Sequence, residues 1–410
     1  MKDTACIAIV CFILAPFYVS SFNFAPLQHR ATLRPMISDE EDDGLFLDLD
    51  LDAQVLDPQD PNKSWGIIED SQVFVEPLEK SANEGSSNCT RFVLMSDTHA
   101  KHRSIRLPRG DVLIHAGDAT KAGEPGTIRD LNLFFHEAKE KFEDVIFVAG
   151  NHDITLHTDF YVNNWMKFSR RNKGRKPWNE EEIQGSLTSC TYLRDSSCQT
   201  TKLGLEVYGS PWSPTYGCWA FGKERGDAIR QLWQSIPEST DVLVTHGPPL
   251  GRGDLTFHSG RTGCLDLLQE VQNRVKPRLH VFGHIHEGHG YTFDGHTLYV
   301  NAACVDLRYQ PTRFCIVVDV PHDESKPAMI VQPECRIQTP DQFLQWLKQR
   351  NFEKLLSFAQ ESDLTHIPLG NDLFDEETYA QVCSVLDLYR DGDARKEWQE
   401  AASQLYSESF

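Results

Sequence analysis

The stretch RFVLMSDTH (91–99) joins a short apolar run directly to an aspartate and a histidine. The same arrangement recurs along the chain, in DVLIHAGD (111–118), DVIFVAGNHD (144–153), DVLVTHGPP (241–249) and LHVFGHIH (279–286). Each run has the length and the β-branched or aromatic content of a buried strand. Helical stretches lie between strands at 127–141 and 264–275, and later strands are expected at 297–301 and 313–320. This alternation predicts a layered α/β domain.

Residue types that bind metals follow the predicted strands. In α/β folds, ligands collect beyond the carboxyl ends of the strands. Ions of the Mn, Fe or Zn type accept imidazole and carboxylate together. One such motif is common by chance, but all of them in order indicate a two-metal hydrolase. The predicted metal ligands are two carboxylates, one amide and four imidazoles: Asp97, His99, Asp118, Asn151, His246, His284 and His286.

The spacing also divides these ligands between two ions. Two ions about 3.5–4 Å apart need a bridging ligand, usually a carboxylate, and Asp118 is the candidate bridge. Asp97 and His99 should point to the same side of an extended segment, because side chains two residues apart share a face, and His286 would join them on one ion. The second ion would be held by the remaining residues: Asn151, His246 and His284.

Charge arithmetic favours phosphate chemistry. Two divalent ions, two carboxylates and a bridging hydroxide sum to about +1, which attracts a phosphoester anion. The hydroxide would attack phosphorus while the ions neutralise the developing charge. His152 is the candidate general acid for the leaving oxygen, because an imidazole proton is available near neutral pH. Asp153 is placed next to it to orient it.

The ordered motifs D-x-H, GD, GNHD, an isolated His and GHxH resemble the calcineurin-like metallophosphoesterase superfamily. YGSPWSP (208–214), HGPPLG (246–251) and RVKPRLHVFGHIHEGHG (274–290) resemble, more narrowly, the metallophosphoesterase domain-containing family, which is similar to class III cyclic-nucleotide phosphodiesterases. The likeness covers roughly residues 90–320. It implies an α/β fold, a four-layer sandwich of two mixed β-sheets flanked by helices. Some members have Gly in place of the first His of GHxH, so His284 implies a complete site here.

This resemblance implies a dinuclear metal-dependent phosphodiesterase that acts on small diesters of the cyclic-nucleotide type. Its cofactors would be two divalent ions, Mn, Fe or Zn. The alternatives are a phosphomonoesterase or nuclease of the same superfamily, or a nucleotide-binding or scaffold protein with weak catalysis. The expected partner is a small phosphoester, such as a nucleotide. A formal net charge of −20 argues against a stable complex with nucleic acid.

The flanking regions carry no catalytic motif. Residues 1–21 read as a signal peptide, since the apolar run at 5–17 is too short to span a bilayer, and no transmembrane span is expected in the mature chain. Residues 22–88 read as an acidic, largely disordered segment. If 22–37 is a transit peptide the chain goes to a plastid; otherwise it is secreted or stays in the ER. A helical extension is expected over 321–410.

Overall fold

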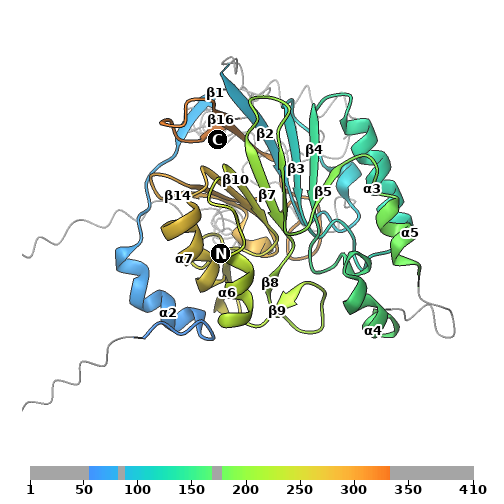
Figure 1. Cartoon of the computed structure of the whole chain (residues 1–410), viewed down its shortest axis with the longest axis horizontal. Coiled ribbons are helices and arrows are strands. Elements are labelled where there is room, and N and C mark those ends of the chain that lie inside the picture. Colours follow the sequence, from blue (N-terminus) through green and yellow to red (C-terminus); the bar gives the residue numbers. More distant parts are fainter. Residues whose placement is uncertain (1–54, 82–87, 169–177, 333–410) are drawn as a thin grey trace, which may run out of the picture. The chain divides into compact units, whose positions relative to one another are not determined.

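Two β-sheets stack face to face in the computed structural model, and helices lie on their outer sides (Figure 1). The structure describes residues 55–81, 88–168 and 178–332, which all belong to one compact unit of the chain. The predicted sandwich of two mixed sheets flanked by helices is confirmed. The predicted signal peptide and transit peptide lie outside the described residues, as does the predicted helical extension except for residues 321–332.

The first sheet has seven strands in the order β1-β17-β16-β2-β3-β4-β5. Strands β2 to β5 run parallel, whereas β16 is antiparallel to β2 and to β17. The parallel strands therefore end at one edge, where their following loops meet. The strands are β1 Leu78–Ser81, β2 Cys89–Met95, β3 Val112–Ala116, β4 Asp144–Val148, β5 Thr191–Leu193, β16 Ile316–Pro321 and β17 Met329–Gln332.

The second sheet has six strands in the order β14-β15-β13-β10-β7-β6. Its central strands β15, β13, β10 and β7 are parallel, and the outer strands β14 and β6 are antiparallel to their neighbours. The strands are β6 Ser196–Gln199, β7 Glu206–Ser210, β10 Val242–Thr245, β13 Leu279–Phe282, β14 Gly290–Phe293 and β15 Leu298–Asn301.

Short elements complete the described part of the chain. The two minor sheets pair β8 Ser213–Pro214 with β9 Gly222–Lys223, and β11 Leu255–Thr256 with β12 Gly260–Arg261. The helices are α2 Pro61–Ile68, α3 Pro125–Ala138, α4 Thr158–Phe168, α5 Glu180–Gly185, α6 Asp227–Trp233 and α7 Leu265–Glu270. Single turns are η2 Glu69–Ser71, η3 His102–Ser104, η4 Ile154–Leu156 and η6 His286–Gly288, and the π-helical turn η5 Val271–Val275 continues α7.

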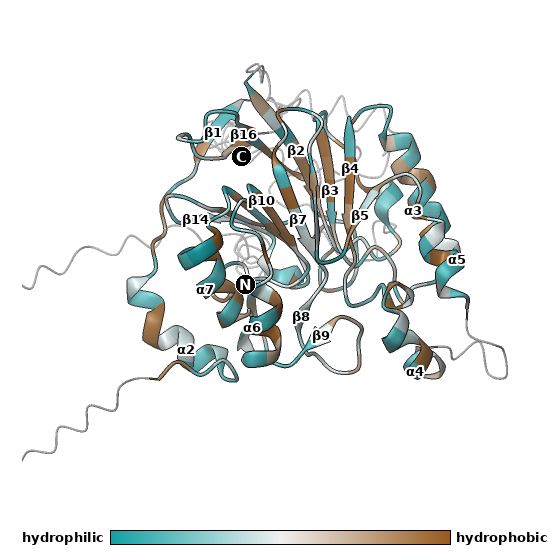
Figure 2. Ribbon diagram, in the orientation of Figure 1, coloured by the Kyte–Doolittle hydropathy of each residue, from teal (hydrophilic) through white to brown (hydrophobic). Residues whose placement is uncertain are grey.

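Alternate residues of each strand enter different cores. Leu94 and Ile114 of the first sheet and Val244 of the second belong to one buried cluster, which fills the space between the sheets. Their neighbours Val93 and Leu113 belong to another cluster with residues of the outer helices. Figure 2 shows the resulting apolar colouring along β2, β3 and β4. Burial on both faces explains why these strands appear in the sequence as continuous apolar runs.

Two regions differ from the predicted domain limits. Residues 22–88 are predicted to be largely disordered, but their described part forms α2 and β1. In the other direction, β17 lies beyond residue 320 and pairs with β1 and β16. These differences share one cause: the elements are stabilised by pairing with segments far away in sequence. Asn62 of α2, for example, donates a hydrogen bond to the carbonyl of Ser259.

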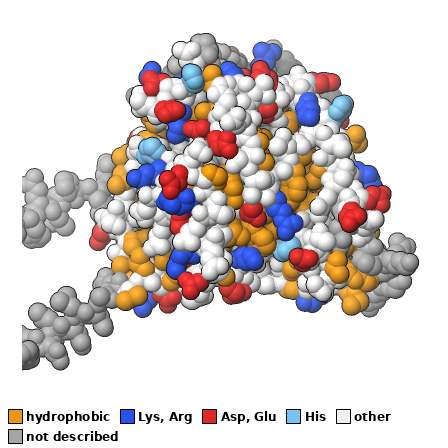
Figure 3. All heavy atoms as spheres, in the orientation of Figure 1, with side chains coloured by type: hydrophobic (Ala, Val, Ile, Leu, Met, Phe, Trp, Pro, Cys, Tyr) orange, Lys and Arg blue, Asp and Glu red, His pale blue; other side chains and the backbone are white. Residues whose placement is uncertain are grey.

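The surface carries charges of both signs. Lys and Arg side chains on the face in Figure 3 are interspersed with Asp and Glu, and apolar side chains lie between them. Such mixing gives no continuous basic band on this face for a nucleic-acid backbone. None of the helices in the described ranges is long and apolar enough to cross a membrane.

Candidate metal centre

The seven predicted ligands come together at the edge where the parallel strands of both sheets end. They lie in the loops after β2, β3, β4, β10 and β13. Three groups of side chains offer donor atoms within 4.8 Å of one another: Asp97, His99 and His286; His99, Asp118 and His152; Asp118, His246 and His284. Asn151 joins them through its Oδ1, 2.9 Å from Nε2 of His246. We call the seven predicted ligands the donor cluster.

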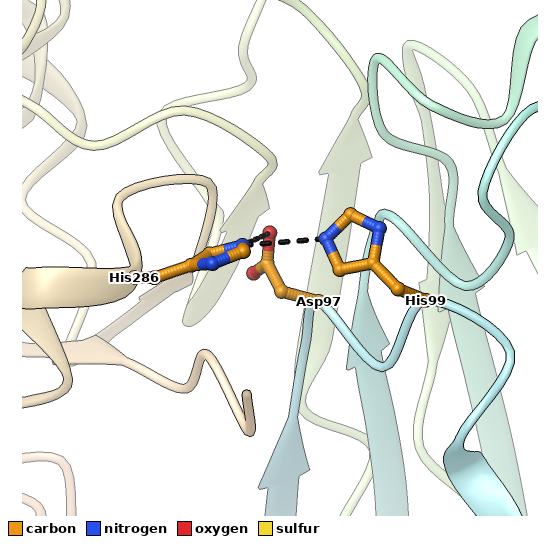
Figure 4. A group of neighbouring side chains, drawn as sticks. All are labelled: Asp97, His99 and His286. Atoms are coloured by element: carbon orange, nitrogen blue, oxygen red, sulfur yellow. Dashed lines mark hydrogen bonds and ion pairs between the residues drawn. The ribbon is translucent and has the colours of Figure 1, made fainter. Parts of the chain in front are cut away.

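The backbone reaches this arrangement through left-handed turns. Asp97, His99 and Asp118 have φ values of 53°, 42° and 54°, and His284 has 67°. The predicted extended segment carrying Asp97 and His99 is therefore wrong, although the two side chains do meet (Figure 4). The segment turns because backbone N–H groups of Asp97 and His99 bond to carbonyls in the loop after β3. Non-glycine residues at positive φ are uncommon and cluster at functional sites.

The glycines of two motifs allow the donors to approach closely. A Cβ added to Gly150 would collide with the carboxylate and the backbone of Asp118. A Cβ on Gly283 would collide with the carboxylate of Asp97 and the side chain of Ser96. Glycine is thus required at both positions by the carboxylates packed against the backbone.

The hydrogen bonds of two histidines direct their lone pairs inward. Nδ1 of His246 lies 3.0 Å from the carbonyl of Ala116, and Nδ1 of His286 lies 3.2 Å from the carbonyl of Asp306. A carbonyl only accepts, so each Nδ1 carries the hydrogen and each Nε2 presents a lone pair. A backbone carbonyl behind a ligating histidine is a common way to fix this tautomer.

These lone pairs face other acceptors. Nε2 of His246 lies 3.4 Å from Oδ1 of Asp118, besides its contact with the amide oxygen of Asn151. Nε2 of His286 lies 3.6 Å from Oδ1 of Asp97 (Figure 4). Acceptors this close repel each other unless a cation lies between them. The donor set therefore fits divalent ions, which take imidazole and carboxylate together.

In the metal-free protein, protons take the place of these cations. Burial lowers the pKa of His246, but the charge and hydrogen bond of Asp118 outweigh burial and raise it to about 9. Burial lowers the pKa of His284 to about 3. Burial also works against ionisation of Asp118, yet the charges of His246 and His152 hold its pKa well below the usual range. At neutral pH an ionised Asp118 therefore lies beside a protonated His246, although both are buried.

His152 lies at the edge of the donor cluster and is half-buried. Its Nδ1 donates to the carbonyl of Lys121 at 2.8 Å, and its ring stacks on Trp219 with centroids 3.9 Å apart. Its ring also meets that of His99 edge-on at 4.7 Å. With Nδ1 engaged, Nε2 is the nitrogen free to serve the site, as the predicted proton donor or as a ligand.

Asp153 does not orient His152 in this structure, so the predicted role is wrong. Its buried carboxylate instead accepts hydrogen bonds from the backbone N–H groups of Ala119, Thr120 and Gly150, and from the Thr120 hydroxyl. Burial and the charge of Asp118 raise its pKa to about 6. Asp153 therefore joins the loops after β3 and β4. Sequence adjacency suggested a contact with the His152 ring that the turn does not make.

Each sheet supports its ligand loop with the same pair of residue types. The hydroxyl of Thr98 lies 2.9 Å from Nε2 of His115, and that of Thr245 lies 2.9 Å from Nε2 of His280. All four residues are fully buried, and each threonine directly adjoins a predicted ligand. Burial lowers the pKa of both histidines to about 3, so both are neutral.

The sequence did not identify three aromatic residues beside the donor cluster. Trp219 stacks on His152, Tyr309 meets His99 and His286, and Tyr216 lies 6.5 Å from His284 between ring centroids. They lie in irregular loops, where single aromatic residues give no pattern to read.

The comparisons agree with the geometry. Residues 90–288 match the family described as calcineurin-like phosphoesterase. The chain is 45% identical over 253 residues to metallophosphoesterase domain-containing protein 1 of Homo sapiens, covering 60% of this chain and 76% of that protein. It is 38% identical over 240 residues to UPF0046 protein C25E10.12 of Caenorhabditis elegans, covering 57% and 82%. UPF0046 protein T07D4.2 of the same organism is 33% identical over 285 residues, covering 64% and 69%.

Proposed function

The chain belongs to the calcineurin-like phosphoesterases, in the family of metallophosphoesterase domain-containing protein 1, and we propose that it hydrolyses small phosphodiesters of the cyclic-nucleotide type. The family and the donor cluster together make it a metal-dependent phosphoesterase. What the proposal adds is the substrate class, the number of ions and the roles of single residues.

The observation that carries the proposal is the charge of the donor cluster. Among its members only Asp97 and Asp118 carry negative charge, and Asn151 and the imidazoles are neutral when they act as ligands. Two divalent ions would therefore leave a site of about +2 before water binds, and about +1 once a water has lost its proton. A diester carries one negative charge and matches that value.

We assign two ions of the Mn, Fe or Zn type to the cluster. Asp97, His99 and His286 would hold one, and His246, His284 and Asn151 the other, with Asp118 between them. Such ions would acidify a bound water molecule and neutralise the charge that develops on the phosphoryl oxygens. The donor atoms already lie within reach of one another, so little rearrangement is needed to bind.

The chain's own residues supply the proton for the leaving group. His152 lies beside His99 and Asp118, and its Nε2 is left free because Nδ1 donates to the carbonyl of Lys121. Trp219 stacks against its ring and holds the ring plane. A proton on Nε2 can therefore pass to the leaving alkoxide, which would otherwise be a poor leaving group.

A substrate panel tests the proposal. The chelated protein is reloaded separately with Mn, Fe or Zn and assayed on p-nitrophenyl phosphate, bis(p-nitrophenyl) phosphate, 2′,3′- and 3′,5′-cyclic AMP and a single-stranded oligonucleotide. We expect turnover of the diesters to exceed that of the monoester, and none by the chelated protein. Preference for the monoester or the oligonucleotide would replace the proposal with a phosphomonoesterase or a nuclease. Tight nucleotide binding without turnover would favour a binding protein.

A further inference from the structure

Tyr309 lies against the donor cluster and is still 43% exposed. Its ring centroid is 4.7 Å from that of His99 and 5.4 Å from that of His286, and the ring is nearly perpendicular to both, at 81° and 86°. It therefore touches both histidines of one predicted ligand group while part of its surface faces solvent. An aromatic surface in this position would meet whatever is attached to a phosphate bound by the cluster.

The backbone places Tyr309 there at a cost. Its φ is 59°, in the left-handed region that a bulky side chain rarely adopts. The carboxylate of Asp306 accepts hydrogen bonds from the N–H groups of Arg308 and Gln310, and the N–H of Tyr309 donates to the Asp306 carbonyl. Lys101 donates to the side chain of Gln310 at 2.7 Å. Strain that is held in place by several bonds is a common property of ligand-binding loops.

The loop is also coupled to a predicted ligand. The carbonyl of Asp306 that accepts from Tyr309 accepts from Nδ1 of His286 as well. Arg313 donates to the carbonyl of His286 from the other end of the loop. These two hydrogen bonds tie the loop to His286, and the Tyr309 ring already lies against both histidines.

We propose that Tyr309 is a specificity-determining residue, on which a planar aromatic group of the substrate stacks while the phosphate occupies the donor cluster. The ligand class is a phosphate ester of a nucleobase-like group. This inference rests on the proposed function for the place of the phosphate. Tyr309 lies outside the region that matches the family model, which ends at residue 288. Stacking on one aromatic side chain generally strengthens binding about tenfold.

Binding of a matched ligand pair tests the inference without requiring turnover. AMP and ribose 5-phosphate share the sugar phosphate and differ in the base. Calorimetric titration of the metal-loaded full chain should show that Tyr309→Ala weakens AMP binding about tenfold and ribose 5-phosphate binding less than about twofold. Tyr309→Phe keeps the ring and should bind AMP like the wild type.

Leu307→Ala is the control for the loop itself. Leu307 lies two residues away on the same loop and is 51% exposed, and its truncation should change neither affinity. Metal content is measured in each variant, because Tyr309 packs on His99 and His286. Both affinities falling together, with or without metal loss, would make Tyr309 a support for the histidines and overturn the inference.

Two other results would also overturn it. The first is a wild-type protein that binds AMP no better than ribose 5-phosphate. The second is a Tyr309→Phe variant as weak as Tyr309→Ala, which would assign the effect to the hydroxyl. Failure of the proposed function looks different, because then no diester is hydrolysed whether or not Tyr309→Ala loses its preference for AMP.

Discussion

The two sheets contribute different chemistry to one site. The seven-stranded sheet supplies both carboxylates and the amide, together with His99, whereas the six-stranded sheet supplies imidazoles alone: His246, His284 and His286. Neither sheet could hold two ions by itself, and every group of donors that includes His246 or His286 draws on both sheets. The site therefore depends on the apolar cluster packed between the sheets, which fixes their separation.

The largest loss of activity should come from replacing a carboxylate of the seven-stranded sheet. Asp118 belongs to two of the three groups of donors, whereas His246 belongs to one. Asp118→Ala should lower kcat/KM by at least about ten-thousandfold, because charge neutralisation by the ions supplies several kcal/mol. His246→Ala should lose less and should recover partly in excess metal. If the two variants lost activity equally, or if excess metal rescued Asp118→Ala, the two sheets would not contribute differently to catalysis.

His152 tests whether the seven-stranded sheet also supplies the acid. His152→Ala should keep its metal and lose about a thousandfold on cyclic AMP, within the usual range of about 10²–10⁴ for general acid catalysis. The loss should shrink on bis(p-nitrophenyl) phosphate, whose leaving group needs little protonation. Metal analysis accompanies the kinetics. A variant that loses metal, or is equally slow on both substrates, would place His152 among the ligands.

A smaller effect, on metal affinity, should result from matching substitutions in the two sheets. Thr98 and Thr245 each tie a ligand loop to a buried neutral histidine, at the same distance of 2.9 Å. Thr98→Val and Thr245→Val should each weaken metal binding about tenfold, as the loss of outer contacts at metal sites does. Competition with a chromogenic chelator measures this. If only one variant responds, the two ties are not equivalent supports.

The sequence predicted the donor cluster well because its residues directly follow strands. An apolar run that ends in Asp or His carries its own position in the fold, and the resemblance covered every one of these motifs. The sequence wrongly predicted an extended segment for Asp97 and His99. Both residues have positive φ values, because their backbone N–H groups bond to the loop after β3. The sequence also wrongly predicted that Asp153 orients His152, because its carboxylate accepts a hydrogen bond from Thr120 in the loop after β3.

Features held by distant contacts were not predictable. Helix α2 carries no long apolar pattern and is fixed by Asn62, which accepts from the backbone of Arg261, and by Trp65, on whose ring the Arg261 guanidinium lies at 4.3 Å. Tyr309 gave no signal either, because its position follows from a single backbone torsion and from the two histidines it meets. Both depend on tertiary packing, which a local pattern does not contain.

The smallest expected effect is a difference in how two histidines of the six-stranded sheet, His246 and His284, make stability depend on pH. In the metal-free protein the pKa of His246 is raised to about 9 and that of His284 is lowered to about 3. An unfolded histidine titrates near 6.5. The stability that His246 contributes is therefore fully present below about pH 6.5 and is lost as the pH rises through 9. His284 is neutral in the folded protein throughout that window and is also neutral in the unfolded chain above about pH 7.5, so it should contribute no slope between about pH 7.5 and 9.

Thermal unfolding of the metal-free protein between about pH 7.5 and 9 measures this difference. The wild-type melting temperature should fall by roughly 2–4 °C more than that of His246→Gln, which has no proton to lose. His284→Gln should keep the wild-type slope, because His284 carries no proton in either the folded or the unfolded state over this range. Metal should flatten the wild-type curve, since a bound ion replaces the proton on His246. A flat wild-type curve without metal, or a slope that His284→Gln abolishes, would mean that His246 is not the protonated partner of Asp118.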